Sequence, residues 1–112
     1  MNAVDNDQEK EVTGAYVNCK LNYRFVRLLI DSGCEHSLLN EKTAKRIGAI
    51  INPPNFDDVL ELRTADGHVM NVVGTVDADM RIAGITICHT FYILRELNTP
   101  GILGTHFLRQ YK

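Results

Sequence analysis

The sequence predicts an all-β domain: a closed barrel or sandwich of short strands with one or two short helices. Strand-length apolar runs recur along the 112-residue chain, separated by turn signals about every ten residues, and this spacing is typical of small barrels and sandwiches. In several runs apolar and polar residues alternate, which is the period of a strand with one buried face. No repeat or low-complexity tract suggests another architecture.

Composition and charge restrict the function classes. The chain is 45% hydrophobic and 23% charged, with a net charge of −2, which is ordinary for one globular domain. This charge gives no global attraction to nucleic acid, so no nucleic-acid partner is expected. Because no apolar stretch approaches the roughly 18 residues of a membrane span, no membrane partner is expected either.

The N-terminal part divides into a polar segment and two strands. Residues 1–11 are acidic and polar, so we expect a disordered leader that is no signal peptide, followed by one domain over residues 12–112. Ala15, Val17, Cys19 and Leu21 alternate with polar residues. We therefore predict a half-buried strand, and a turn at Leu21-Asn22. The next strand, residues 24–30, becomes apolar on both faces, as strands covered on both sides do.

A short apolar piece and a helix follow. Ser37-Leu38-Leu39 indicates a further strand, and Asn40 is a suitable N-cap for a helix that begins at Glu41. Gly48 is the expected stop. Two prolines within residues 51–58 predict a loop, because proline cannot continue a strand ladder.

The second half of the chain returns to strands. The expected elements, in order, are a strand around Leu60 and Leu62, a hairpin turn at Asp66-Gly67, an alternating strand from Val76 to Ile82, a turn at Ala83-Gly84, a return strand from Ile85 to Leu94, a break at residues 99–101, and a last short helix. Asp-Gly and Ala-Gly pairs suit tight turns because glycine tolerates positive φ.

Asp31 is the first candidate functional residue. The strand of residues 24–30 is the most buried stretch of the first half, and it runs directly into Asp31-Ser32-Gly33. A carboxylate on a turn between rigid strands is held as catalytic groups commonly are. The alternative is a plain turn, for which the same three residues are well suited.

Four motifs occur in a fixed order. They are Leu28-Leu29-Ile30-Asp31-Ser32-Gly33, Ser37-Leu38-Leu39, Thr64-Ala65-Asp66-Gly67 and Gly101-Ile102-Leu103-Gly104-Thr105-His106-Phe107-Leu108. In this order the chain resembles the retropepsins, the aspartic proteases of retroviruses and LTR retrotransposons, and their cellular relatives. The third and fourth motifs look most like those of gypsy-type retrotransposon proteases. The resemblance covers roughly residues 12–111.

The resemblance implies a fold and an activity. It implies a closed barrel of short antiparallel strands that corresponds to half of a pepsin-like bilobal fold. Since the chain has a single Asp-Ser-Gly turn, Asp31 would meet Asp31 of a second copy at the axis of a symmetric homodimer. Two adjoining carboxylates share one proton, so one acts as base on water while the other polarises the scissile carbonyl. The implied function is an aspartic endopeptidase that cleaves a Gag-Pol-type polyprotein.

The resemblance also implies roles for individual residues. Beside Asp31, Ser32 would hydrogen-bond across the dimer axis and Gly33 would face the substrate backbone. The tip of a flap over the extended peptide would consist of Asp66, Gly67 and His68. The floor of the site would include Cys34 and Ile102, with Ile85 as a further pocket residue. No metal or organic cofactor is implied.

Two features depart from the family pattern. His106 replaces an acidic or amide residue that usually ties the last helix to the active-site loop, and the charge of a histidine responds to pH. The sequence printed ends just after that helix, at Tyr111-Lys112, where viral relatives continue into a further strand of the dimer sheet. Dimerisation would then be weaker or would use the N-terminal segment.

The cysteines indicate a reducing compartment. The chain has three, Cys19, Cys34 and Cys88, and no Cys-x-x-Cys, so we expect three free thiols and a cytoplasmic protein, including the interior of retroelement particles. Cys34 is either a small buried packing residue or an oxidisable thiol beside the active site. Cys-His pairs at 34/36 and 88/89 match no closed zinc set.

Two other functions remain open from the sequence. One is a retropepsin-like dimerisation or peptide-binding module with little or no catalysis, which the His106 and C-terminal departures favour. The other is a cellular protease of the ubiquitin-shuttle kind, which shares the same motifs.

Overall fold

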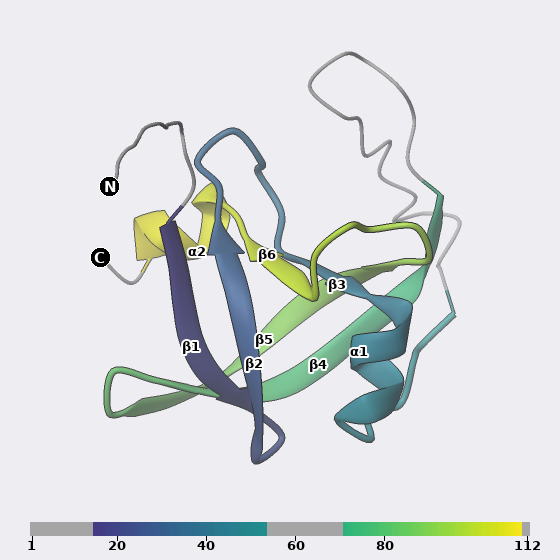
Figure 1. Ribbon diagram of the computed structural model, residues 1–112, viewed down its shortest axis with the longest axis horizontal. Coiled ribbons are helices and arrows are strands. Elements are labelled where there is room, and N and C mark those ends of the chain that lie inside the picture. Colours follow the sequence, from purple (N-terminus) through teal and green to yellow (C-terminus); the bar gives the residue numbers. More distant parts are fainter. Residues whose placement is uncertain (1–14, 54–70, 111–112) are drawn as a thin grey trace, which may run out of the picture.

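The computed structural model describes residues 15–53 and 71–110. Within these ranges the chain forms six strands and two short helices (Figure 1). In chain order they are β1 (Ala15–Leu21), β2 (Arg24–Ile30), β3 (Leu38–Asn40), α1 (Glu41–Arg46), β4 (Val72–Ile82), β5 (Ile85–Leu94), β6 (Gly101–Leu103) and α2 (Thr105–Gln110). The expected mostly-β architecture with two short helices is confirmed.

The six strands close into a barrel in the order β1-β2-β6-β3-β5-β4. The two long hairpins, β1–β2 and β4–β5, are antiparallel, and β4 returns to pair with the end of β1. The pairings β2–β6 and β3–β5 are parallel. The expectation of antiparallel strands is therefore wrong for these two pairings. They arise because the short strands β3 and β6 are inserted between the hairpins, antiparallel to each other.

Two-residue turns connect both hairpins. Asn22 and Tyr23 join β1 to β2 with φ of 47° and 71°, and Ala83 and Gly84 join β4 to β5 with φ of 50° and 82°. Consecutive positive φ values are typical of the turns whose twist matches that of the strands. The turn at Ala83-Gly84 is confirmed, and the first turn lies one residue later than predicted.

The barrel interior contains one apolar core. Its fully buried side chains come from every strand, and α2 adds Phe107; the largest are Leu21, Leu28, Leu39, Met80, Phe91, Ile93 and Leu103. The alternation predicted for residues 76–82 is confirmed, since Val76, Ala78 and Met80 are buried while the residues between them are exposed. A core drawn from all six strands holds the barrel ends in fixed positions.

Helix α1 is capped as the sequence predicts. The Asn40 side chain accepts a hydrogen bond from the Lys42 amide at 2.8 Å, and Gly48 adopts a φ of 72° just after the helix. Within the described residues, no helix is long and apolar enough to cross a membrane. The expected leader (residues 1–11), the strand around Leu60 and the hairpin at Asp66-Gly67 lie outside the described ranges.

Candidate active site

Asp31 lies at the end of the barrel opposite the β1–β2 turn. It follows β2 directly, in the blue loop that begins at the β2 arrowhead in Figure 1. Its amide donates a hydrogen bond to the Leu103 carbonyl at 3.1 Å, which extends the parallel pairing of Ile30 with Leu103. The carboxylate is therefore carried by two strands that the core fixes, and the residue is half-buried.

The residues after Asp31 form a tight turn around its carboxylate. Oδ1 of Asp31 accepts a hydrogen bond from the Gly33 amide at 2.8 Å, and the Cys34 amide donates to the Asp31 carbonyl at 3.2 Å. A Cβ atom at Gly33 would lie 3.2 Å from the same Oδ1, closer than a carbon and an oxygen normally pack. Ser32 and Gly33 are exposed, so this turn is accessible to a second molecule.

Hydrogen bonds from the start of α2 stabilise the loop that follows the turn. The amides of Thr105 and His106 donate to the carbonyls of Cys34 and Glu35, at 2.8 and 3.0 Å. Gly104 lies directly under this loop, because a Cβ atom there would be 2.5–2.8 Å from three of its carbonyl oxygens. The Ile-Leu-Gly motif is thus required sterically: only glycine lets β6 pass this close to the loop.

A second set of hydrogen bonds connects the loop to β5. The Ser37 hydroxyl is 2.8 Å from Nε2 of His89, and the same oxygen accepts a hydrogen bond from the Gly104 amide at 3.3 Å. The His89 ring contacts the rings of Phe91 and Phe107 edge to face, with centroids 5.1 Å apart. Burial, and to a smaller extent the neighbouring His106, lowers the pKa of His89, so the neutral ring is favoured.

This link was not predicted from the sequence, which placed His89 only within the return strand from Ile85 to Leu94. The pattern contained a signal for it. His89 has the same strand parity as Phe91 and Ile93, which are buried, so its ring had to face the barrel and needed a partner there.

The His106 ring does not make the contact between the last helix and the Asp31 loop that was expected from an acidic or amide side chain at this position. The side chain is exposed, and the tie to the loop is made by the His106 backbone amide together with the Ser37–His89 hydrogen bond. The departure at this position therefore leaves the Asp31 loop supported.

The predicted floor residues lie together beside this loop. Ile102 is buried in a small apolar cluster against which Cys34 packs; its other members are Leu29, Leu38, Val72, Tyr92, Leu94 and Leu97. Ile85 is separate from them, since it pairs with Ile82 next to the β4–β5 turn. The assignment of Ile85 to a pocket near Asp31 is therefore wrong.

Cys34 behaves as a packing residue. Its thiol donates to the His36 carbonyl at 3.1 Å. Burial raises the pKa of this thiol, and the charges of Asp31 and Glu35 act in the same direction against the opposing effect of that hydrogen bond. The protonated thiol is a weak nucleophile, which disfavours the redox alternative. All three cysteines are free thiols, as predicted.

Within the described ranges, no group of three or more potential metal ligands occurs. The predicted flap tip, Asp66, Gly67 and His68, lies outside those ranges. The predicted roles of Ser32 and Gly33 require a second copy and stay predictions. What the described chain provides is one carboxylate, on a hydrogen-bonded turn beside an apolar cluster.

Known proteins are similar to this chain in sequence. A family model described as "gag-polyprotein putative aspartyl protease" matches residues 17–110. The "Protein DDI1 homolog" of Leishmania major is 26% identical over 107 residues, which are 91% of this chain and 26% of that protein. The chain thus spans about a quarter of the length of this curated relative.

Solved structures are similar in fold. The retroviral protease-like domain of Ddi1 from Leishmania major is 25% identical, with a TM-score of 0.68 over 90% of this chain and 79% of that one. EIAV protease in complex with an inhibitor is 13% identical, with a TM-score of 0.71 over 93% of both chains. A retropepsin-like aspartic protease from Rickettsia conorii is 15% identical, with a TM-score of 0.61 over 88% of this chain and 72% of that one.

Proposed function

The chain belongs to the retropepsin-like aspartyl proteases, the family described as "gag-polyprotein putative aspartyl protease", and from that premise we propose that it is an endopeptidase acting as a symmetric homodimer. One observation carries the proposal. Asp31 stands on a turn held by β2, β6 and the start of α2, with the neighbouring Ser32 and Gly33 exposed. This geometry suits a carboxylate that must meet an identical one across a two-fold axis.

The chemistry of such a pair follows from electrostatics. Two carboxylates that adjoin at the axis cannot both ionise cheaply, so they hold one proton between them and titrate as a unit. The ionised member takes a proton from a water molecule as that water attacks the peptide carbonyl. The protonated member donates a hydrogen bond to the carbonyl oxygen, where negative charge develops. The amide of Gly33 keeps one oxygen of each Asp31 oriented throughout.

The proposed substrate is an extended polypeptide, specifically a Gag-Pol-type polyprotein. An extended peptide would lie across the two Asp31 turns, with side chains directed to the apolar floor that contains Ile102 and Cys34. We also propose a cytoplasmic location, including retroelement particles, on the basis of the three free thiols.

A second candidate is a cellular protease of the ubiquitin-shuttle kind. The observation that favours it is the similarity to the DDI1 homolog of Leishmania major in both sequence and structure. Digesting a peptide library and a Gag-type polyprotein side by side would separate the two candidates. Efficient cutting of the polyprotein at discrete sites favours the first, and its resistance while cellular substrates are cut favours the second.

The first prediction concerns Asp31→Asn, which removes the proton-sharing carboxylate with little change in shape. Peptide cleavage by the unchanged chain should be greatest below neutral pH, where the pair keeps its shared proton, and should fall by at least about a thousandfold in the variant. Asp79→Asn, an exposed carboxyl on β4, is the matched control and should cleave normally. Cleavage that persists in Asp31→Asn would exclude this mechanism, and absence of cleavage by the unchanged dimer would favour the binding-module alternative.

A further inference from the structure

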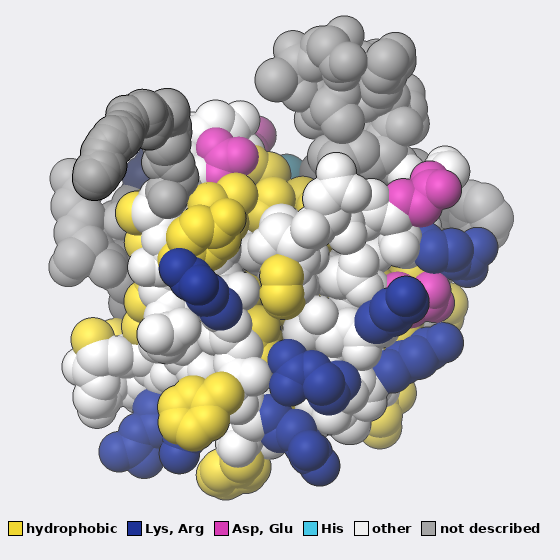
Figure 2. Space-filling view, viewed as in Figure 1, with side chains coloured by type: hydrophobic (Ala, Val, Ile, Leu, Met, Phe, Trp, Pro, Cys, Tyr) yellow, Lys and Arg dark blue, Asp and Glu magenta, His cyan; other side chains and the backbone are white. Residues whose placement is uncertain are grey.

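A basic surface surrounds the β1–β2 turn, at the far end of the barrel from Asp31. The seven residues of β2 separate the two ends, a distance of about 20 Å at the rise of a strand. Figure 2 shows Lys and Arg side chains gathered over the lower part of one face, around this turn and α1. We call it the turn surface, and its residues are Lys20, Asn22, Tyr23, Arg24, Phe25 and Arg46.

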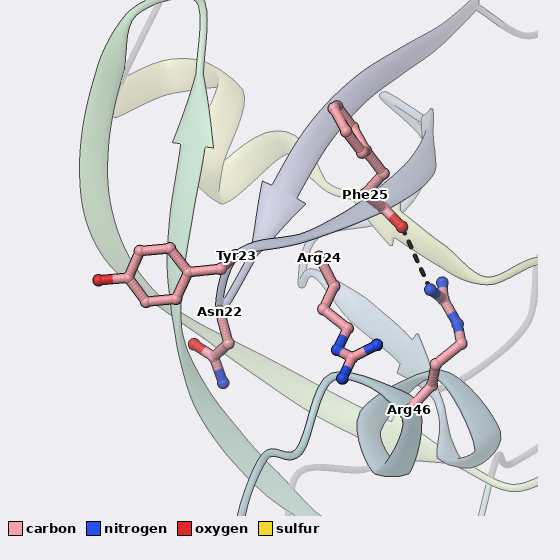
Figure 3. Close-up of a pocket in the computed structure, with 5 residues that line it drawn as sticks. All are labelled: Asn22, Tyr23, Arg24, Phe25 and Arg46. Carbon is pink, nitrogen blue, oxygen red and sulfur yellow. Dashed lines mark hydrogen bonds between the residues drawn. The ribbon is translucent and has the colours of Figure 1, made fainter.

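An open pocket of about 550 Å³ forms the centre of the turn surface. It is lined by Asn22, Tyr23, Arg24, Phe25 and Arg46. In Figure 3 the guanidinium groups of Arg24, from β2, and Arg46, from α1, extend into the same space. Arg46 donates a hydrogen bond to the Phe25 carbonyl at 3.3 Å, which holds its side chain against β2 (Figure 3). The pocket lining therefore presents two forked cationic donors and no carboxylate.

Within residues 15–53 and 71–110, neither Arg24 nor Arg46 forms an ion pair, whereas Lys45 and Arg95 both pair with Glu41. Lys20 lies directly opposite Arg81 on the neighbouring strand β4. Like charges in that position destabilise a sheet, so the arrangement costs stability unless an anion meets it.

Exposed aromatic rings lie among the cations. The exposed fractions are 89% for Tyr23 and 71% for Phe25, high values for side chains that gain stability from burial. The Lys20 ammonium lies 4.9 Å from the Phe25 ring centroid.

We propose that the turn surface binds single-stranded nucleic acid, with a backbone phosphate in the Arg24–Arg46 pocket and bases stacked on Phe25 and Tyr23. Guanidinium groups bind phosphate through paired hydrogen bonds. Alternating cations and open aromatic rings are the combination by which proteins hold single strands without reading sequence. An acidic peptide would use the cations and make no use of the exposed Tyr23 ring. The net charge of −2 hid this surface, because the charge is unevenly distributed over the molecule.

The test is a titration of the whole 112-residue chain with a fluorescently labelled oligothymidylate of about 15 nucleotides, a length within the range of single-strand sites. Fluorescence anisotropy at several salt concentrations gives the affinity and its salt dependence. Affinity should fall with rising salt. The double variant Arg24→Ala/Arg46→Ala should flatten the log–log slope by about 0.7, since the pocket holds one phosphate and each lost phosphate contact to a single strand contributes about 0.7.

Matched variants distinguish binding at the turn surface from a general effect of positive charge on the protein. Arg95→Ala/Arg109→Ala removes the same charge from exposed positions outside the turn surface and should bind as the unchanged chain does. Tyr23→Ala/Phe25→Ala keeps every charge and should weaken binding by about tenfold per ring. Arg24→Glu is a second test with little risk to folding, because the Arg24 side chain is exposed and makes no hydrogen bond among the described residues. Circular dichroism melting verifies the fold of each variant.

Three outcomes would overturn the proposal. The first is oligonucleotide binding that the control pair weakens as much as the Arg24/Arg46 pair does. The second is binding that survives loss of both rings unchanged. The third is polyglutamate of equal charge competing as well as the oligonucleotide, which would assign the surface to acidic peptides.

Discussion

Gly104 lies where three carbonyl oxygens of the Asp31 loop converge. A Cβ atom there would be within 2.5–2.8 Å of the oxygens of Cys34, Glu35 and His36, and these atoms belong to backbone that α2 holds in place. We predict that Gly104→Ala lowers the free energy of unfolding by about 2–3 kcal/mol, as overpacking does, and lowers peptide cleavage further by displacing Asp31. Urea unfolding monitored by circular dichroism, with a cleavage assay on the folded fraction, measures both.

Gly48→Ala is the control for this substitution. Gly48 has a φ of 72°, and nothing lies within 4 Å of a Cβ atom built there. It should lose only about 1 kcal/mol, from the strained backbone, and keep full cleavage. Equal effects of the two substitutions on both measurements would contradict the steric role assigned to Gly104.

Single residues were predictable where one short motif determines them. The Asp-Ser-Gly sequence after a buried strand identified the Asp31 turn, whereas the strand β6 was not predicted and its first residue, Gly101, was assigned to a break. The hydrogen bond of Ser37 with His89 could not be found in this way, because 52 residues separate the two. Strand parity indicated that His89 faces inward, but only the barrel closure brings Ser37 to it.

At the scale of elements, the contact between β5 and α2 makes the folding stability depend on pH. His89, on β5, faces Phe107 and His106 on α2, Ser37 on the loop and Phe91 on its own strand. Burial first, and His106 second, lowers the pKa of His89 below its usual 6.5. The unfolded chain therefore binds a proton more readily than the folded one. The stability that neutral His89 contributes is complete above pH 6.5 and is lost as pH falls through the lowered pKa.

We predict that the unfolding free energy of the unchanged chain declines from pH 7.5 to pH 5 more steeply than that of His89→Gln. Glutamine can still hydrogen-bond with Ser37 but does not titrate in this range. Urea unfolding at several pH values tests the difference. As a control, His106→Gln removes a neighbouring charge and should move the NMR titration of His89 toward its ordinary pKa. Parallel pH profiles for the unchanged chain and His89→Gln would show that His89 does not carry the effect.

Elements were predictable where local chemistry determines them. The Asn40 cap, the turn at Ala83-Gly84 and the buried alternation of β4 each depend on neighbouring residues only, and each occurs as predicted. The short strand β3 was also predicted, from Ser37-Leu38-Leu39, but the strand β6 and the parallel pairings of both depend on contacts between distant segments. For the same reason Ile85 was misplaced. Its apolar character indicated a pocket, but its position beside a hairpin turn removes it from the site.

At the scale of the whole molecule, the two ends of the barrel have different chemistry. One end carries Asp31 beside an apolar cluster, and the other carries the turn surface with its uncompensated arginines. The long β1–β2 hairpin keeps them apart. A second copy that joins at Asp31 therefore leaves the turn surface of each subunit exposed, so peptide cleavage and nucleic-acid binding could proceed at the same time.

The dimer itself makes a quantitative prediction for mixed subunits. If each active site needs Asp31 from two copies, a subunit carrying Asp31→Asn inactivates every dimer that it enters. After equal amounts of unchanged and variant chains exchange freely, only about one quarter of the dimers contain two intact subunits. Cleavage per total protein should then fall to about one quarter of that of the unchanged chain, whereas independent monomers would retain about half. Dilution to a concentration at which sedimentation shows monomers should abolish cleavage. A mixture that keeps half of the activity, or a monomer that cleaves, would mean that Asp31 works without a partner carboxylate.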